Sequence, residues 1–582
     1  MFAMFALVCP AFTTGLAALP PAQQAYFKAS NAETNDNFGW SVAVSGNTAV
    51  VGALLESSNA TGINGDQSDN SAPQAGAAYV FVREGTNWVQ QAYLKASNPG
   101  GQWPGEEFGD LFGWAIAISG DTLVVGAPYE DSNATGIDGD QTNNDTADSG
   151  AAYVFVRNGT NWVQQAYLKA SNPGNGDHFG HWVAISGDTV VVGAPFEDSN
   201  ARGVNGNQDD NSLLNSGAAY VFARDGTNWA QQAYLKASNT GGPSSGEAFG
   251  DNFGVSVGIS GDTVVVGSVY EDSNAKGVNG NQSNDSALQS GAAYVFVRSG
   301  TNWSQQAYLK ASNTGSSDEF GWAVAISGDT VAAGAAGEGS DAVEVNGDQN
   351  NNRTPGAGAV YVFVRQGTNW LQQAYLKASS VLGDDGLGFS VALSGDVLVA
   401  GAPGDDNRTP GINPGPSDES AFNAGAAYVF VREGTNWTQR AYLKGSNTAG
   451  PLPGEDYGDD LGADHMVAVS GDTVIVGGHA EDSNGIGVNG NQTERSARDS
   501  GAAYVFTGFA PGPRLGLAAE RSSGFVLSFI AVPDVTYRLQ RAHSVSGPWD
   551  TISTNKAPAS GVIEYRETTP PMDAAFYRSL QL

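Results

Sequence analysis

Short hydrophobic segments recur along most of the chain, separated by glycine turns and by long polar stretches. In a typical copy, the alternating segment Val-Ala-Ile precedes a Ser-Gly-Asp-Thr turn, which leads into the β-branched segment Val-Val-Val-Gly-Ala-Pro. Alternation with a period of two indicates a half-buried strand, and a short β-branched run indicates a buried one. The pattern therefore predicts an all-β chain.

Each copy contains two further predicted strands. After a long polar loop comes Gly-Ala-Ala-Tyr-Val-Phe-Val-Arg, and a Gly-Thr-Asn-Trp turn joins this segment to Gln-Gln-Ala-Tyr-Leu-Lys-Ala-Ser. Four antiparallel strands in each of seven repeats predict a seven-bladed β-propeller. The glycine of the Ser-Gly turn marks the seven copies: Gly46, Gly120, Gly187, Gly261, Gly328, Gly395 and Gly471.

The two ends of the repeat array complement one another. A fourth-strand segment at residues 23–30 precedes the first complete repeat, and the last third-strand segment, at 501–506, has no fourth strand after it. A ring closed by its own N-terminal strand leaves no open sheet edge between the first and last blades. We therefore expect residues 23–30 to complete the seventh blade of a propeller that spans residues 23–507.

The connections between strands divide between two faces of such a propeller. The turn between strands one and two and the turn between strands three and four are short, and both lie on one face. Six of the turns between strands three and four carry a tryptophan, which we interpret as a packing residue. The long polar loops between strands two and three, and the connections between blades, lie on the opposite face. Because variable loops on a rigid frame are where binding sites concentrate, this long-loop face is the predicted binding face.

The segment Phe112-Gly113, followed by Gly126-Ala127-Pro128, resembles the FG-GAP repeat. That repeat builds the seven-bladed propeller at the head of integrin α chains, and the longer motif here is similar to the bacterial secreted branch of the family. The integrin-like repeats hold a calcium loop between their first two strands. Here the Ser-Gly-Asp-Thr turn stands in that place, and it is too short to supply about six to eight oxygen ligands. The calcium sites of the family are therefore not transferred to this chain.

The loops between strands two and three offer a different metal hypothesis. They carry a Glu-Asp-Ser-Asn segment and, further on, a glycine turn flanked by Asp or Asn and followed by Gln. Oxygen-rich side chains around a glycine suit calcium, but Asp and Asn also cap turns by bonding to their own backbone. Both interpretations remain open at this point. The candidate calcium ligands are Asp66, Asp131, Asp138, Asp140 and Asp348.

The seventh repeat departs from the pattern of the others. An alignment on the turn glycine places Asp464 at the glycine of Phe-Gly and His465 beside it, and His479 replaces the proline of Gly-Ala-Pro. Together with Asp460, these side chains could form a metal or acid–base site. The alternative is neutral drift in one repeat.

Catalytic motifs are otherwise missing from the sequence. It contains no nucleophile motif, phosphate-binding glycine loop or HExxH pattern. The third repeat has a smaller irregularity, His178 and His181. We therefore expect a protein that is not an enzyme, and the alternative is a polysaccharide-active enzyme with its site in the seventh blade.

The net charge and the N-terminal segment limit the cellular location of the protein and the kinds of partner that it can bind. The net charge of −33 argues against nucleic acid and anionic membranes as partners. Residues 1–18 are apolar, too short to span a membrane and similar to the core of an export signal. The single cysteine, Cys9, lies in that segment, so the exported chain would form no disulfide.

Residues 514–582 alternate apolar and polar positions and resemble a fibronectin-III-like β-sandwich. The whole chain is therefore predicted to be a secreted or cell-surface monomer without a transmembrane span. Its expected function is adhesion or binding, through recognition of an extracellular protein or glycan on the long-loop face. A structural surface protein without a specific ligand is a further alternative, and calcium is the single cofactor considered.

Overall fold

The structure is a computed structural model of the 582-residue chain. Every regular element among the described residues is a β-strand, which confirms the all-β fold class. None of the described residues belongs to a helix that is long and apolar enough to cross a membrane. The predicted export signal, residues 1–18, lies outside the described part. The described residues are 20–100, 108–242, 250–380, 382–414, 418–452, 458–509, 515–520, 524–530, 536–542, 550–556, 562–567 and 576–581.

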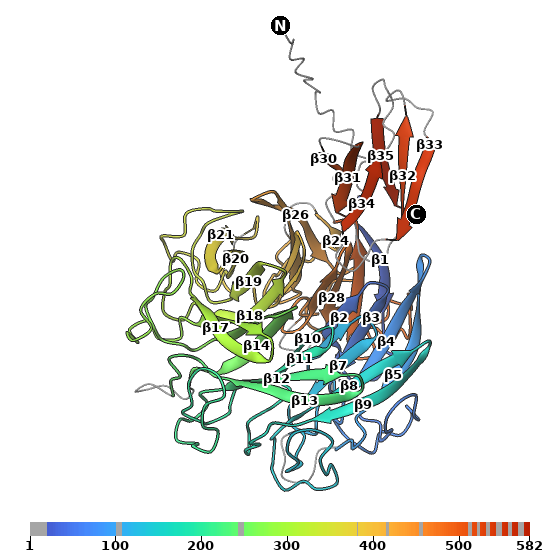
Figure 1. Cartoon of the computed structure of the whole chain (residues 1–582). Helices are drawn as coiled ribbons and strands as arrows, with labels where there is room; N and C mark the ends of the chain where they lie inside the picture. Colours follow the sequence, from blue (N-terminus) through green and yellow to red (C-terminus); the bar gives the residue numbers. More distant parts are fainter. Residues whose placement is uncertain are drawn as a thin grey trace. The chain divides into compact units, whose positions relative to one another are not determined.

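The chain divides into two compact units, of which the larger spans Ala22–Thr507 and the smaller combines Met1–Pro21 with Gly508–Leu582. The larger unit is the predicted seven-bladed propeller, with its antiparallel sheets arranged around a central axis (Figure 1). The first strand of each blade is innermost, and the first strands of adjacent blades contact one another around the ring. The β-branched second strands are fully buried between their neighbours, as their composition predicts.

The first blade consists of β2 (Phe38–Ser45), β3 (Thr48–Ala53), β4 (Ala77–Glu84) and β5 (Asn87–Leu94). The next three blades contain β6 (Ile116–Ser119), β7 (Thr122–Ala127), β8 (Ala151–Asn158) and β9 (Asn161–Leu168); β10 (Trp182–Ser186), β11 (Thr189–Ala194), β12 (Ala218–Asp225) and β13 (Asn228–Leu235); and β14 (Phe253–Ser260), β15 (Thr263–Ser268), β16 (Ala292–Ser299) and β17 (Asn302–Leu309). The fifth and sixth blades contain β18 (Phe320–Ser327), β19 (Thr330–Ala335), β20 (Ala359–Gln366) and β21 (Asn369–Leu376); and β22 (Val391–Ser394), β23 (Val397–Ala402), β25 (Ala426–Glu433) and β26 (Asn436–Lys444), with the short β24 (Gly411–Ile412) at its edge.

The seventh blade joins the two ends of the propeller sequence. It contains β27 (Val467–Ser470), β28 (Thr473–Gly478), β29 (Ala502–Thr507) and, as its outer strand, β1 (Ala22–Phe27). Strand β1 pairs antiparallel with β29, and Tyr26 lies opposite Tyr504. The predicted closure by the N-terminal strand is therefore confirmed.

Two glycines of the repeat allow adjacent blades to approach closely. Gly113, in Phe-Gly, has a φ of +98°, and a Cβ there would lie 2.4 Å from the carbonyl oxygen of Ala77 in the preceding blade. Gly126, in Gly-Ala-Pro, has the carbonyl oxygen of Gly180 in the following blade at 2.0 Å from its ideal Cβ position. Any side chain at either position would separate the blades, which is why the motif requires glycine.

A fully buried lysine near the end of each outer strand forms an ion pair inside its blade. Lys169 Nζ donates to Glu130 Oε2 at 2.8 Å and to Ser149 Oγ at 2.7 Å, and the side chains of the pair are 0% and 1% exposed. Burial lowers the pKa of Lys169, and the adjacent carboxylate opposes that shift. The seven pairs are Lys28–Glu481, Lys95–Glu56, Lys169–Glu130, Lys236–Glu197, Lys310–Glu271, Lys377–Glu338 and Lys444–Asp405.

A second buried carboxyl occurs in the connection before each blade. Asp36 accepts a hydrogen bond from the backbone N–H of Glu33 at 2.9 Å, and burial raises its pKa to about 7. Its neighbours include Glu56, Glu33 and Lys28, and the removal of the carboxyl from water has the largest effect. The seven residues are Asp36, Asp110, Asp177, Asp251, Asp318, Asp385 and Asp459.

The tryptophans of the turns between third and fourth strands pack between blades, as interpreted from the sequence. Trp162 is buried, and its Nε1 donates to Gln91 of the preceding blade at 2.9 Å. The guanidinium of Arg157 lies over the indole, 5.2 Å from the ring centre. These rings are therefore not available as a platform for a ligand.

The smaller unit contains two antiparallel three-stranded sheets among its described residues. One has the order β30-β31-β34 and the other β33-β32-β35. This arrangement agrees with the predicted β content, and the fibronectin-III-like identity stays a prediction. The strands are β30 (Leu515–Glu520), β31 (Gly524–Ile530), β32 (Thr536–Ala542), β33 (Asp550–Lys556), β34 (Val562–Glu567) and β35 (Phe576–Gln581).

Substitution of Lys28 by Met tests the closing ion pair. We expect K28M to lower the free energy of unfolding by about 3–5 kcal/mol, because Glu481 would keep a buried charge without its cation. The double variant K28M/E481Q should recover part of this loss. Urea unfolding gives the values, and K276M, at an exposed lysine, is the control. A loss no larger than that of K276M would contradict the role of the pair.

Substitution of Asp36 by Asn tests the buried carboxyl. The folded pKa of about 7 exceeds the ordinary 3.8, so folding binds a proton and the wild type loses stability as the pH rises between these values. The amide keeps a hydrogen-bond acceptor without this loss. D36N should therefore be more stable than the wild type at pH 8, by about 1–3 kcal/mol, and similar to it near pH 4. Melting curves across that range measure the effect, and the exposed D225N should not change the pH dependence.

Candidate binding face

Three of the predicted calcium ligands cap tight turns in exposed loops. Asp140 Oδ1 accepts hydrogen bonds from the backbone N–H of Thr142 at 2.9 Å and from its hydroxyl at 2.7 Å. These bonds lower the pKa of Asp140. Asp66 makes the same pair of contacts with Ser68, and Asp348 accepts from the backbone and side-chain amides of Asn350. Each carboxylate therefore stabilises the turn to which it belongs.

The other two predicted ligands also bind backbone N–H groups. Asp138 has a φ of +53°, and its Oδ1 accepts from the N–H of Tyr167 at 2.9 Å. Asp131 is buried and accepts from the N–H of Asp148 at 2.8 Å. In each of the other six blades, the side-chain oxygen of an Asn accepts the equivalent hydrogen bond from a tyrosine backbone N–H. These residues are Asn64, Asn205, Asn279, Asn346, Asn413 and Asn489.

An acceptor that Asn can replace does not need a negative charge, so the geometry favours the turn-capping interpretation of these loops. Within the described ranges, no three Asp, Glu, His or Cys side chains come together in a way that could hold a metal ion. Calcium binding by the loops stays a prediction.

The seventh blade corrects the alignment made from the sequence. Gly462, and not Asp464, occupies the glycine position of Phe-Gly, because its N–H donates to Gly477 O at 3.0 Å. In the second blade, Gly113 N–H makes the same contact with Gly126 O, also at 3.0 Å. The Phe-Gly motif did not mark this position, because Leu461 precedes the glycine here, as Leu387 precedes Gly388 in the sixth blade.

The cause of the misalignment is a two-residue insertion. Gly462 is nine residues before the turn glycine Gly471, whereas Gly113 is seven residues before Gly120. Asp464 therefore does not replace the glycine of the repeat. It lies with His465 in an extra segment at the start of the innermost strand.

This insertion reaches across the central axis. Asp464 Oδ1 accepts a hydrogen bond from Trp322 Nε1 of the fifth blade at 2.6 Å. The ring of His465 lies 3.9 Å from that of Trp182 in the third blade, measured between centroids. The carbonyl oxygen of His465 accepts a hydrogen bond from the N–H of Val42, in the first blade, at 3.0 Å. One short segment thus connects four blades at the end of the axis that belongs to the long-loop face.

His479 follows β28 and also faces the axis, with its ring 5.1 Å from that of Trp40. Its Nδ1 lies 3.6 Å from Asp460 Oδ2, which is too long for a hydrogen bond. Burial lowers the pKa of His479 to about 4 and that of His465 to about 3, and it raises the pKa of Asp460 to about 7. The histidines therefore remain neutral at physiological pH.

Aromatic side chains that the sequence interpretation did not select complete this region, which we call the axial cluster. Trp40 and Trp114 lie 5.1 Å apart between ring centroids, and Trp322 lies 4.8 Å from Phe389. The position after the glycine of this motif, compared across the repeats, carries the signal, since it is Trp or Phe in four of them and His in a fifth. The axial cluster comprises Trp40, Trp114, His181, Trp182, Trp322, Phe389, Asp460, Asp464, His465 and His479.

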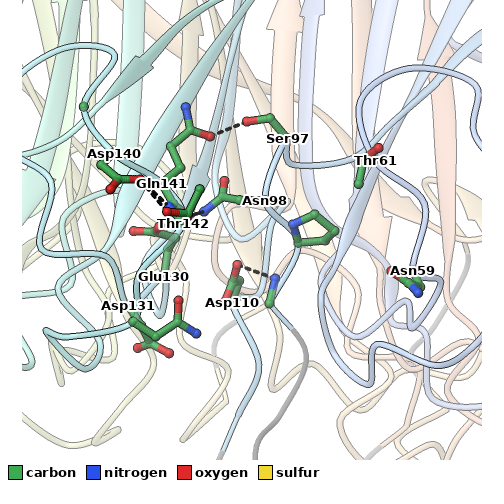
Figure 2. Close-up of a pocket in the computed structure, with 14 residues that line it drawn as sticks. Asn59, Thr61, Ser97, Asn98, Asp110, Glu130, Asp131, Asp140, Gln141 and Thr142 are labelled. Atoms are coloured by element: carbon green, nitrogen blue, oxygen red, sulfur yellow. Dashed lines mark hydrogen bonds between the residues drawn. The ribbon is translucent and has the colours of Figure 1, made fainter.

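A polar groove of about 960 Å³ lies between the first and second blades on the long-loop face (Figure 2). Its interior is held by hydrogen bonds, such as that from Ser97 Oγ to Gln141 Oε1 at 2.6 Å and that from Asn98 Nδ2 to Glu130 Oε1 at 2.9 Å. Asn59 and Thr61 line one side and are both exposed, and their side chains make no hydrogen bond to any described residue. The groove therefore combines a fixed floor with unused polar groups.

Comparison with known families matches the chain to the family described as FG-GAP repeat. Each matched segment begins at or near the fourth strand of one blade and ends in the third strand of the next. No curated protein matches the chain. The matched residues are 21–81, 88–155, 162–222, 229–296, 303–363 and 370–430.

A thermal melt with excess calcium and with chelator tests the two interpretations of the loops. If the carboxylates only cap turns, the melting temperature should be the same in both conditions. A rise of several degrees with calcium would show that the folded state binds the ion and would contradict this expectation. D140N, which keeps the acceptor but not the charge, should remove such a rise.

Proposed function

We propose that this chain, which belongs to the FG-GAP repeat family, is a secreted or cell-surface binding protein that recognises an extracellular protein or glycan on its long-loop face. The propeller of this family is a fold of surface and binding proteins that is usually not catalytic. Such a protein needs a rigid frame with accessible polar groups on one face.

The groove between the first two blades is the observation that carries the proposal. Its floor is tied to the frame, because Asn98 binds Glu130 and the buried cation of Lys169 holds Glu130 in place. A ligand would find donors and acceptors there without reorganisation of the site, which reduces the entropic cost of binding. The free side chains of Asn59 and Thr61 supply hydrogen bonds at the rim.

The alternative of a polysaccharide-active enzyme rests on the seventh blade. General acid–base catalysis works best with a group whose pKa is near the working pH. The pKa values of about 3 and 4 for His465 and His479 do not meet that requirement, whereas those of Asp460 and Asp464, about 7, do meet it. We favour binding without turnover over catalysis because the groove that carries the proposal is lined by neither of these carboxyls. We favour it over a purely structural surface protein because such a protein would not need the groove.

Arrays of extracellular proteins and of glycans, probed with the full chain, test the proposal. The double variant N59A/T61A should weaken binding to the identified ligand about tenfold, because it removes two hydrogen-bonding side chains. The control N274A/K276A changes exposed residues at the corresponding loop positions of the fourth blade and should bind like the wild type.

Two results would contradict the proposal. One is the absence of any ligand on both arrays. The other is release of product from a polysaccharide panel that is lost in H465A, which would favour the enzyme.

A further inference from the structure

The axial cluster presents aromatic rings on the long-loop face. Trp40, Trp114 and Trp322 come from three different blades and are all half-buried. In contrast, the tryptophans between third and fourth strands are buried beneath arginine side chains. The rings of the axial cluster therefore keep accessible surface that packing of the blades does not use.

Several nitrogen atoms of the cluster have no partner in the described part of the chain. They are the indole Nε1 atoms of Trp40 and Trp114 and the Nδ1 atoms of His181 and His479, which are all buried. Buried polar atoms are usually paired, and each unpaired one needs an explanation. An enclosed water, or a ligand that displaces the rings, would supply the missing contacts.

The charge of the cluster indicates the chemical class of the ligand. The three imidazoles have lowered pKa values and stay neutral, and the pKa of Asp460 and that of Asp464 are raised to about 7. The two carboxyls interact with each other, and the groups around them include Glu319, Tyr270, Trp322 and the imidazole of His479. No described lysine or arginine forms an ion pair with either carboxyl.

These properties do not suit a metal ion or an anion. The described residues contain no metal-binding group of three or more Asp, Glu, His or Cys, and an anion would meet acidic side chains without a cation. A neutral ligand with hydroxyl groups and an apolar face would use the rings, the unpaired nitrogens and the carboxyl oxygens together.

We propose that the axial cluster is a carbohydrate-binding site, in which a sugar ring lies against the indoles of Trp40 and Trp114. Hydroxyl groups of the sugar donate hydrogen bonds to the carboxyl of Asp460 or Asp464, and a rotation of the buried indole N–H groups toward the ligand lets the hydroxyls accept from them. This inference rests on the proposed function, and it specifies the ligand class and a second position on the same face.

Titration calorimetry with oligosaccharides identified on the array tests the proposal with the full chain. W114A removes an aromatic face and should weaken glycan binding at least tenfold. W40F keeps a smaller aromatic ring and removes the N–H, so it should weaken binding less while the melting temperature stays within a few degrees of the wild type. If W114A fails to fold, W40F, which keeps a phenyl ring, and D464N, which keeps the volume of the side chain, still test the site.

The outcomes separate this inference from the proposed function. Weaker binding in W40F and W114A, with N274A/K276A unchanged, supports the axial site. Glycan binding that both tryptophan variants leave unchanged overturns the axial site and leaves the proposed function intact. Binding only to proteins, or to a lysine-rich peptide in place of a glycan, overturns the carbohydrate class. Failure to bind any ligand overturns both proposals.

Discussion

The ion pair of a buried lysine with a buried carboxylate is the interaction on which the architecture depends. It occurs once in each blade and connects the outer strand to the start of the long loop, so that two distant parts of the sheet share one contact. A buried pair contributes little net stability, because both ions lose their hydration. Any arrangement that separates the two charges leaves a buried ion without its partner and costs much more free energy. The pair therefore fixes the position at which each long loop leaves its blade.

That constraint explains how irregular loops can form a defined surface. Lys169 fixes Glu130, which holds Asn98, and the same set of contacts forms the floor of the groove between the first two blades. The glycines of Phe-Gly and Gly-Ala-Pro act in a complementary way, because they set the distance between blades. The frame and the candidate site therefore depend on the same residues, so substitutions in the frame would also alter binding.

The fold could be predicted from the sequence because its signals are local and repeated seven times. The strands, the turns and the closing segment at residue 23 all follow from short motifs. The ion pairs were not predicted, although every repeat shows the lysine, because the partner of Lys169 lies thirty-nine residues earlier and no local pattern connects them. The axial site was found only in part. Asp464, His465 and His479 were selected because they break the symmetry of the repeats. The two-residue insertion was detected only from the backbone contacts of Gly462. Trp40 and Trp114 were missed because they belong to different blades and come together only when the first two blades pack side by side.

Closure by β1 also sets the order of events during synthesis. Lys28 is made early, and its partner Glu481 follows 453 residues later. The outer strand of the seventh blade therefore has no native partner until almost the whole propeller has been made, whereas every other blade is complete within its own stretch of sequence. Contacts between such distant residues form slowly, and an unpaired strand can bind other sheet edges. The pairing of β1 with β29 is thus the folding step at which a nascent chain is most exposed to misassembly.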